Sequence, residues 1–417
     1  MIGGIYKMVR IFYLIILGAL FFEGRAANSD SIKININVFI ENSASMDGYV
    51  NGVTEFENYI YSMLGEFKSN KFCDTLNLNY INNKIINIAK DANNESIENF
   101  ITTLESAKFK RKGGDRSVSD LKSVIKNILN QVDDKNVSIL ISDFIFSSNG
   151  NGSDVTLLKR QGIGITNDFA DKLNKTDLGV IILHLESNFN GIYYDKNNVQ
   201  IKINQKRPFY IWIVGALKNI TNVVNQNLIN LNNEDYKNVF VLQSINKTTI
   251  PNYKIIKNNK NGNFKLKENA KGPITDAEVS TKGKDKGKFG FELAVDLGKN
   301  IQSKGFYLNN SIYGINGNYN LIARINSDTS SPQLKDFTHV LQIQTTKLQN
   351  ESLVVNILQE IPNWISNIST NDDTKINLID KNKTYGFKYL VSGVFNAFDA
   401  KSKSKIINSI KIKIERN

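Results

Sequence analysis

Oxygen-bearing side chains follow an apolar run near the start of the chain, in the sequence VFIENSASMDGYV over residues 38–50. Glu41, Ser43 and Ser45 come directly after the apolar part, and a further acid, Asp143, lies near the end of the apolar segment LISDF. Carboxylates and hydroxyls are hard oxygen donors of the kind that Mg²⁺ and Ca²⁺ prefer. If both apolar segments are strands of one parallel sheet, their carboxyl ends lie at one edge, and these oxygens meet around a single divalent cation.

Each of these residues also has an ordinary structural explanation. Ser43 and Ser45 can form a turn and cap the helix that follows, and Asp143 can cap a loop. Their joint placement at one predicted edge of the sheet favours the metal site, while the structural explanation stays open.

The elements that must position these residues alternate between apolar strands and amphipathic helices. Apolar strands are expected at residues 32–40, 137–146, 178–185 and 209–215. Helices with apolar residues at three- and four-residue spacing are expected at 54–67, 121–132 and 216–231. Strands that are apolar on both faces are typical of a parallel sheet covered by helices. The predicted fold class is therefore α/β, with a doubly wound, mostly parallel sheet, followed by a β-rich carboxyl-terminal part with one helix.

The chain divides into three predicted regions. Residues 1–26 are expected to form a signal peptide, residues 32–233 the α/β domain, and residues 234–417 a β-rich domain with a sandwich-like pair of sheets. Residues 187–208 stand where a helix would be expected, but they predict a hairpin insertion with the turn DKNN at 195–198.

The amino terminus has the pattern of an export signal. Lys7 and Arg10 precede the apolar run IFYLIILGALFF, and Gly24 and Ala26 are placed as the small residues of a cleavage site. The apolar run is shorter than the roughly 20 residues that a membrane-spanning helix needs. The mature protein is expected to be periplasmic or secreted, with no transmembrane span after signal cleavage.

Composition argues against several classes of function. The net charge is +12, but the basic residues are mostly Lys and spread along the chain, so no nucleic-acid partner is expected. Cys73 is the only cysteine and there are two histidines, which argues against a zinc site or a Cys/His catalytic pair. The sequence contains no Gly-x-Ser-x-Gly elbow and no phosphate-binding loop. An enzyme is therefore not expected.

The order of these motifs resembles the von Willebrand factor A-type (vWA) domain, over about residues 32–231. In that family the first strand ends in Asp-x-Ser-x-Ser, a later loop supplies a Thr, and a later strand ends in Thr/Ser-Asp-Gly. Together these form a metal-ion-dependent adhesion site that holds Mg²⁺. Here ENSASM stands where the first motif would, and LISDF looks like the strand that carries the second acid.

The resemblance implies a variant ligand set. The expected metal ligands are Glu41, Ser43, Ser45, Asp115, Ser117 and Asp143. Asp115, in the loop GGDRSVS, takes the place of the family's Thr, with Ser117 nearby. Glu41 replaces the family's first Asp, and Phe144 replaces the Gly that follows the later Asp.

The resemblance also implies a binding function. A bound Mg²⁺, or Ca²⁺ or Mn²⁺ in its place, would capture an acidic group on a protein partner at the bacterial cell envelope. An alternative is a structural protein of an envelope assembly, whose site has lost the metal. A third hypothesis, a metal-dependent hydrolase, requires a general base that the sequence does not indicate.

Overall fold

The computed structural model describes residues 33–111, 113–116, 120–146, 155–327, 334–378, 381–402 and 404–417. The signal peptide expected at residues 1–26, and the expected ligand Ser117, lie outside these residues. Residues Ile34–Asn417 form one compact unit. Among the described residues, each helix is too short or too polar to cross a lipid bilayer.

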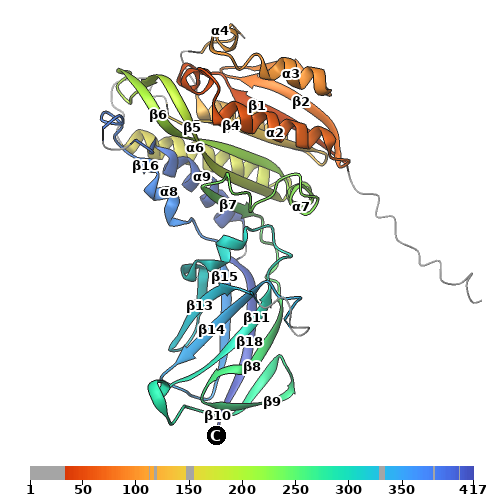
Figure 1. The fold of residues 1–417 in the computed structure, drawn as a ribbon, viewed down its shortest axis with the longest axis vertical. Coiled ribbons are helices and arrows are strands. Elements are labelled where there is room, and N and C mark those ends of the chain that lie inside the picture. Colours follow the sequence, from red (N-terminus) through yellow and green to blue (C-terminus); the bar gives the residue numbers. More distant parts are fainter. Residues whose placement is uncertain are drawn as a thin grey trace, which may run out of the picture. The chain divides into compact units, whose positions relative to one another are not determined.

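A seven-stranded sheet organises the first half of the unit, with the strand order β3-β2-β1-β4-β6-β5-β7 (Figure 1). Its strands are β1 (Ile34–Glu41), β2 (Cys73–Ile81), β3 (Ile85–Ala89), β4 (Asn136–Ser142), β5 (Leu178–Tyr194), β6 (Gln200–Ala216) and β7 (Asn238–Gln243). β1 is parallel to β2 and to β4, whereas the other neighbouring pairs are antiparallel.

The prediction of a doubly wound, mostly parallel sheet of the vWA type is wrong. Strands make up 39% of the structure and helices 29%, in several mixed and antiparallel sheets. The physical reason lies in residues 187–208, which extend β5 and β6 into one continuous hairpin of two 17-residue strands. A tight turn at Asp195 reverses the chain, so β6 returns antiparallel to β5 and also lies antiparallel to β4.

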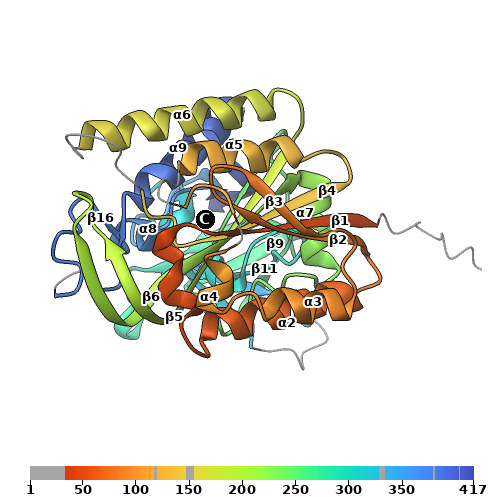
Figure 2. The same ribbon diagram turned by 90° about the horizontal axis from the view of Figure 1, so that it is seen from above.

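Helices cover both faces of this sheet (Figure 2). One face packs against η1 (Ala44–Val50), α2 (Glu55–Ser69), α3 (Asn94–Ile101), α4 (Ser106–Phe109) and α7 (Leu217–Asn225). The other face packs against α5 (Leu121–Gln131), α6 (Val155–Leu173) and α9 (Phe387–Lys401). The apolar stripe predicted at 121–132 is confirmed, because five residues of α5 along it are buried. The expected N-cap of α2 is also confirmed, since the Thr54 hydroxyl accepts a hydrogen bond from the Glu57 N–H.

α9 crosses α6 at very close range, although more than 200 residues separate them in the sequence. A Cβ added at Gly393 of α9 would lie 2.5 Å from the carbonyl oxygen of Gly162 in α6. The Thr166 hydroxyl donates a hydrogen bond of 2.9 Å to the Gly393 carbonyl. The contact therefore requires the absence of side chains at this crossing.

Two further sheets enclose a separate apolar core. The five-stranded sheet has the order β12 (Tyr313–Ile315), β15 (Glu351–Leu358), β18 (Ile406–Arg416), β10 (Gly272–Glu278) and β9 (Asn263–Asn269). The four-stranded sheet has the order β13 (Tyr319–Ile325), β14 (His339–Thr345), β11 (Phe289–Asp296) and β8 (Asn252–Asn261). The short elements are η2 (Gly283–Asp285), η3 (Lys304–Leu308), η4 (Asn310–Ile312), α8 (Asn363–Asn367), β16 (Ser369–Thr370) and β17 (Thr384–Tyr385).

The prediction of only one helix after residue 234 is wrong. Its described part has two α-helices, α8 and α9, and α9 contributes to the core of the seven-stranded sheet. β7 also lies beyond residue 233 and pairs with β5 in that sheet. Apolar periodicity marks the buried face of such elements but does not say which sheet they cover.

Candidate functional site

The end of β1 carries a buried carboxylate that is tied to the end of β4. Glu41 is only 1% exposed, and it accepts a hydrogen bond from the Ser142 hydroxyl. The same hydroxyl oxygen accepts a bond of 2.7 Å from the Phe144 N–H, which fixes its orientation. Because β1 and β4 are parallel neighbours, both strand ends lie at one edge of the sheet.

A second buried carboxyl, Asp143, stands directly after β4 and is 1% exposed. Its Oδ1 accepts a bond of 3.2 Å from the Ile145 N–H, while its Oδ2 has no hydrogen-bond partner within the described part of the chain. Burial and, as the smaller effect, the negative charge of Glu41 raise the pKa of Asp143 to about 7. Hydrogen bonds from Ile145 and Ser45 and the charge of Arg207 act in the opposite direction.

The two predicted serine ligands join this cluster. The hydroxyls of Ser43 and Ser45 lie 3.0 Å apart, and Ser45 is near enough to Asp143 to lower the pKa of its carboxyl. Ser43 is 4% exposed, whereas Ser45 is half-buried. The structure therefore brings together four of the six predicted ligands, and we call Glu41, Ser43, Ser45 and Asp143 the strand-end cluster.

Asp115 has a different environment. It is exposed, and its backbone N–H donates a bond of 3.0 Å to the side-chain oxygen of Asn83 in the turn between β2 and β3. Gly113 in the same loop accepts a bond of 2.9 Å from Asn82. The carboxylate of Asp115 is thus not buried as those of Glu41 and Asp143 are.

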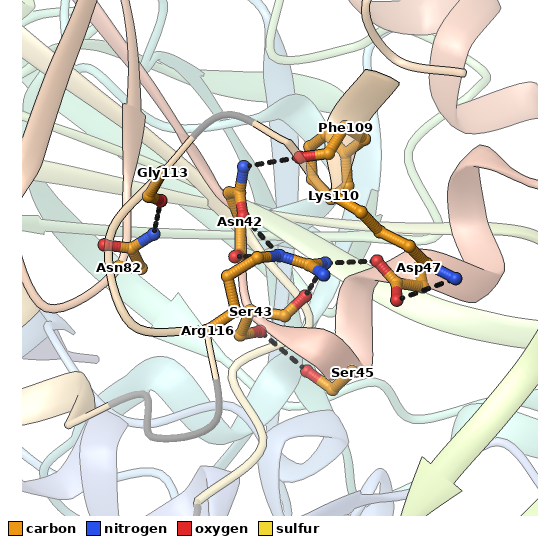
Figure 3. Close-up of polar contacts among 9 residues, drawn as sticks. All are labelled: Asn42, Ser43, Ser45, Asp47, Asn82, Phe109, Lys110, Gly113 and Arg116. Atoms are coloured by element: carbon orange, nitrogen blue, oxygen red, sulfur yellow. Dashed lines mark hydrogen bonds and ion pairs between the residues drawn. The ribbon is translucent and has the colours of Figure 1, made fainter. Parts of the chain in front are cut away.

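Arg116 is a prominent polar residue that the sequence reasoning missed. Its Nε donates to the carbonyl and side-chain oxygens of Asn42, at 3.1 and 2.7 Å, and its Nη2 donates to the Ser43 carbonyl at 3.1 Å. It also forms an ion pair with Asp47, whose other oxygen lies 3.5 Å from the Lys110 ammonium (Figure 3). Arg116 therefore fixes the backbone that presents the serines. The sequence feature that could have indicated this role is its position beside Asp115 in the loop GGDRSVS.

A second missed residue is Arg207 of β6, which is 1% exposed. Its Nη1 donates a bond of 2.9 Å to the Lys381 carbonyl, and its guanidinium lies 4.8 Å from the ring centre of Tyr193. Its charge lowers the pKa of Asp143, so it provides a buried positive charge near the strand-end cluster. The surrounding sequence NQKRPFY did not indicate burial, because Arg207 ends a run of four polar residues, and such a run is typical of exposed chain.

The strand-end cluster can supply two carboxylates and two hydroxyls to a cation. These are the oxygen donors that Mg²⁺ accepts, and the unpartnered Oδ2 of Asp143 fits a ligand position. The described residues contain no group of three or more His, Cys, Asp or Glu placed to hold a metal ion, so water or a partner would have to complete the shell.

Compared with protein-family models, with curated proteins and with solved structures, the chain matches none of them, and its resemblance to the vWA domain stays a prediction.

Proposed function

We propose that the strand-end cluster binds a divalent cation, Mg²⁺ in the first place, and that the bound cation captures an acidic group on a protein partner at the cell envelope. The observation that carries this proposal is the Oδ2 of Asp143, which is buried, unpartnered and close to a second buried carboxyl. Buried polar atoms are nearly always satisfied, and an unsatisfied one calls for an explanation. A cation would satisfy this oxygen and offset both acidic charges.

The arrangement of donors supports the proposed role of each residue. Glu41 and Asp143 approach from the ends of two parallel strands, and the serine hydroxyls approach from the start of η1. Together they supply one side of an octahedral shell, and the bound cation leaves its remaining positions for water or for a carboxylate of the partner. Ser45 is the half-buried member, so we place the open side of the site at η1.

Calorimetric titration with Mg²⁺, Mn²⁺ and Ca²⁺ tests the proposal directly. We expect saturable binding to the native protein and at least tenfold weaker binding to Ser43→Ala/Ser45→Ala. The matched control is Ser62→Ala/Ser69→Ala, which removes two exposed hydroxyls from α2 and should leave binding unchanged. A native protein that binds none of the three cations would contradict the proposal.

A second candidate function is structural, and Arg207 favours it. Here the buried guanidinium offsets the charge of the strand-end cluster without metal, and the protein takes part in an envelope assembly through other surfaces. Crosslinking of partners in the intact organism, with and without EDTA, separates the two candidates. Partner capture that EDTA leaves unchanged supports the structural one.

A further inference from the structure

A concave pocket of about 590 Å³ shares no residue with the strand-end cluster. It is lined by parts of three chain segments, 231–239, 303–312 and 360–364, together with Ile325. Its volume lies in the range of roughly 300–1,000 Å³ that is usual for small-molecule sites. The pocket is therefore large enough to enclose most of a small ligand.

Three aromatic side chains line the pocket, one from each segment: Tyr236, Phe306 and Trp364, all half-buried. Neighbouring groups fix two of them. The Trp364 ring stacks on His184, with the ring centres 5.8 Å apart and an interplanar angle of 14°. The Tyr236 hydroxyl lies 2.7 Å from the Tyr59 hydroxyl. These rings are held in place before any ligand binds, which lowers the entropy cost of binding.

Amide side chains supply the polar part of the lining. The side-chain oxygen of Asn232 accepts a bond of 2.9 Å from the Lys304 N–H, and that of Asn233 accepts one of 2.9 Å from the Asp235 N–H. The side-chain oxygen of Asn309 accepts a bond of 3.1 Å from the Ser311 N–H. In each case the structure pairs the oxygen within the protein, so the NH₂ group is the one left to donate to a ligand.

Charged groups are few in this lining: Lys237, Lys304 and Glu360. A strongly anionic or cationic ligand would find little compensating charge there. Aromatic faces combined with amide donors instead match the chemistry of a sugar ring. One face of a sugar ring presents C–H groups, which pack on the electron-rich face of an aromatic ring, and its rim presents hydroxyl oxygens.

We propose that this pocket binds an uncharged sugar residue, stacked on Trp364 and held by the amide groups of Asn232, Asn233 and Asn309. Free sugars and the sugar units of a polysaccharide share this chemistry. The inference does not depend on the cation at the strand-end cluster.

Tryptophan fluorescence provides a direct test, because the chain has two tryptophans and only one lines the pocket. Trp212 is 1% exposed and stacked on Phe144, with the ring centres 4.6 Å apart. A ligand in the pocket therefore changes the emission of Trp364. We would titrate the native protein with glucose, mannose and N-acetylglucosamine and with their linear trisaccharides, in EDTA. At least one of these sugars should give a saturable change with a Kd on the order of 1 mM or tighter. Comparing the affinity for a free sugar with that for its trisaccharide distinguishes a free-sugar ligand from a polysaccharide.

Two variants locate the binding site. Trp364→Phe keeps an aromatic platform, so calorimetry should still detect the sugar while the fluorescence change is lost. Trp364→Ala should weaken binding at least tenfold. Asn233→Asp keeps the oxygen that accepts from Asp235 but removes the NH₂ donor, and should weaken binding several-fold. Its control is Asn263→Asp, the same change at an exposed position of β9.

Three results would overturn the sugar proposal: no saturable change with any of these sugars, equal affinity in Trp364→Ala, or equal affinity in Asn233→Asp. If Trp364→Ala fails to fold, the affinity of Asn233→Asp for the sugar tests the proposal. EDTA removes divalent cations from every titration. The sugar measurement is therefore independent of whether the strand-end cluster binds a cation.

Discussion

Glu41 and Asp143 place two buried carboxyl groups at the ends of neighbouring parallel strands, close enough for the charge of one to raise the pKa of the other. Burial itself is the larger cause of the raised pKa of Asp143. Two acids in such a position are costly when both are ionised, because neither is hydrated. A bound proton, a nearby Arg or a metal ion each reduces that cost.

The first prediction concerns stability against pH. The pKa of Asp143 is about 7 in the folded protein, against about 3.9 in an unfolded chain. Between these values the folded state binds more protons, so stability should fall as pH rises from about 4 to about 7. The slope from this group is at most about 1.4 kcal/mol per pH unit. Urea unfolding across this range measures it without metal, and Asp143→Asn should flatten the dependence. An unchanged slope in the variant would contradict the assignment.

The second prediction links proton and metal binding. A cation needs the ionised form of Asp143, so Mg²⁺ affinity should increase as pH rises towards 7 and level off above it. Below that pKa the affinity should change by up to about tenfold per pH unit. Calorimetry at several pH values in EDTA-treated protein provides the measurement. Affinity independent of pH between 5 and 7 would be incompatible with Asp143 as a ligand.

The third prediction concerns Arg207. Replacing this buried cation with Met should destabilise the protein by about 3–5 kcal/mol, because the nearby acid loses its compensating charge. The loss should be larger at pH 8 than at pH 5, since Asp143 is ionised at the higher pH. The double variant Arg207→Met/Asp143→Asn should recover part of the loss at pH 8. Additive effects in a denaturant-unfolding cycle would show that the two groups do not interact.

The fourth prediction tests the role of Arg116. Arg116→Met removes the donors to Asn42 and to the Ser43 carbonyl, together with the ion pair to Asp47. We expect a loss of about 2 kcal/mol, measured by thermal unfolding. Lys110→Met is the control, because its half-exposed ammonium also pairs with Asp47 and such surface pairs contribute about 0–1 kcal/mol. Equal effects of the two variants would mean that Arg116 does not hold the loop.

The fifth prediction tests the crossing of α6 and α9. In Gly393→Ala the new methyl group would meet the Gly162 carbonyl at 2.5 Å, which should cost about 1–3 kcal/mol. Gly65→Ala in α2 is a matched control, because no atom lies within 4 Å of its added Cβ. That change should be neutral or stabilise by up to about 1 kcal/mol. Denaturant unfolding measures the change in the free energy of unfolding for each variant. Similar changes in the two variants would argue against the contact between α6 and α9.

Local patterns predicted much of the secondary structure. The buried stripe of α5 and the Thr54 cap of α2 follow from spacing and side-chain chemistry within a few residues, and both are present. The sequence DKNN likewise predicted the turn at 195–198. In the structure the Asp195 side chain accepts hydrogen bonds from the Asn197 and Val199 N–H groups. The sequence also indicated that Glu41, Ser43, Ser45 and Asp143 follow apolar strands, and these four residues do lie together.

The direction of the strands and the positive charges around the site were decided only by the tertiary structure. An apolar strand has the same pattern whether its neighbour runs parallel or antiparallel, and the long hairpin of β5 and β6 fixed that direction. Arg207 contacts the ring of Tyr193 on the other strand of the hairpin and the carbonyl of Lys381, which lies far from it in the sequence. α9 packs its apolar residues into the core of the seven-stranded sheet, and two glycines allow its backbone to approach α6. Periodicity specifies that a face is buried, whereas the partner of that face depends on contacts between distant residues.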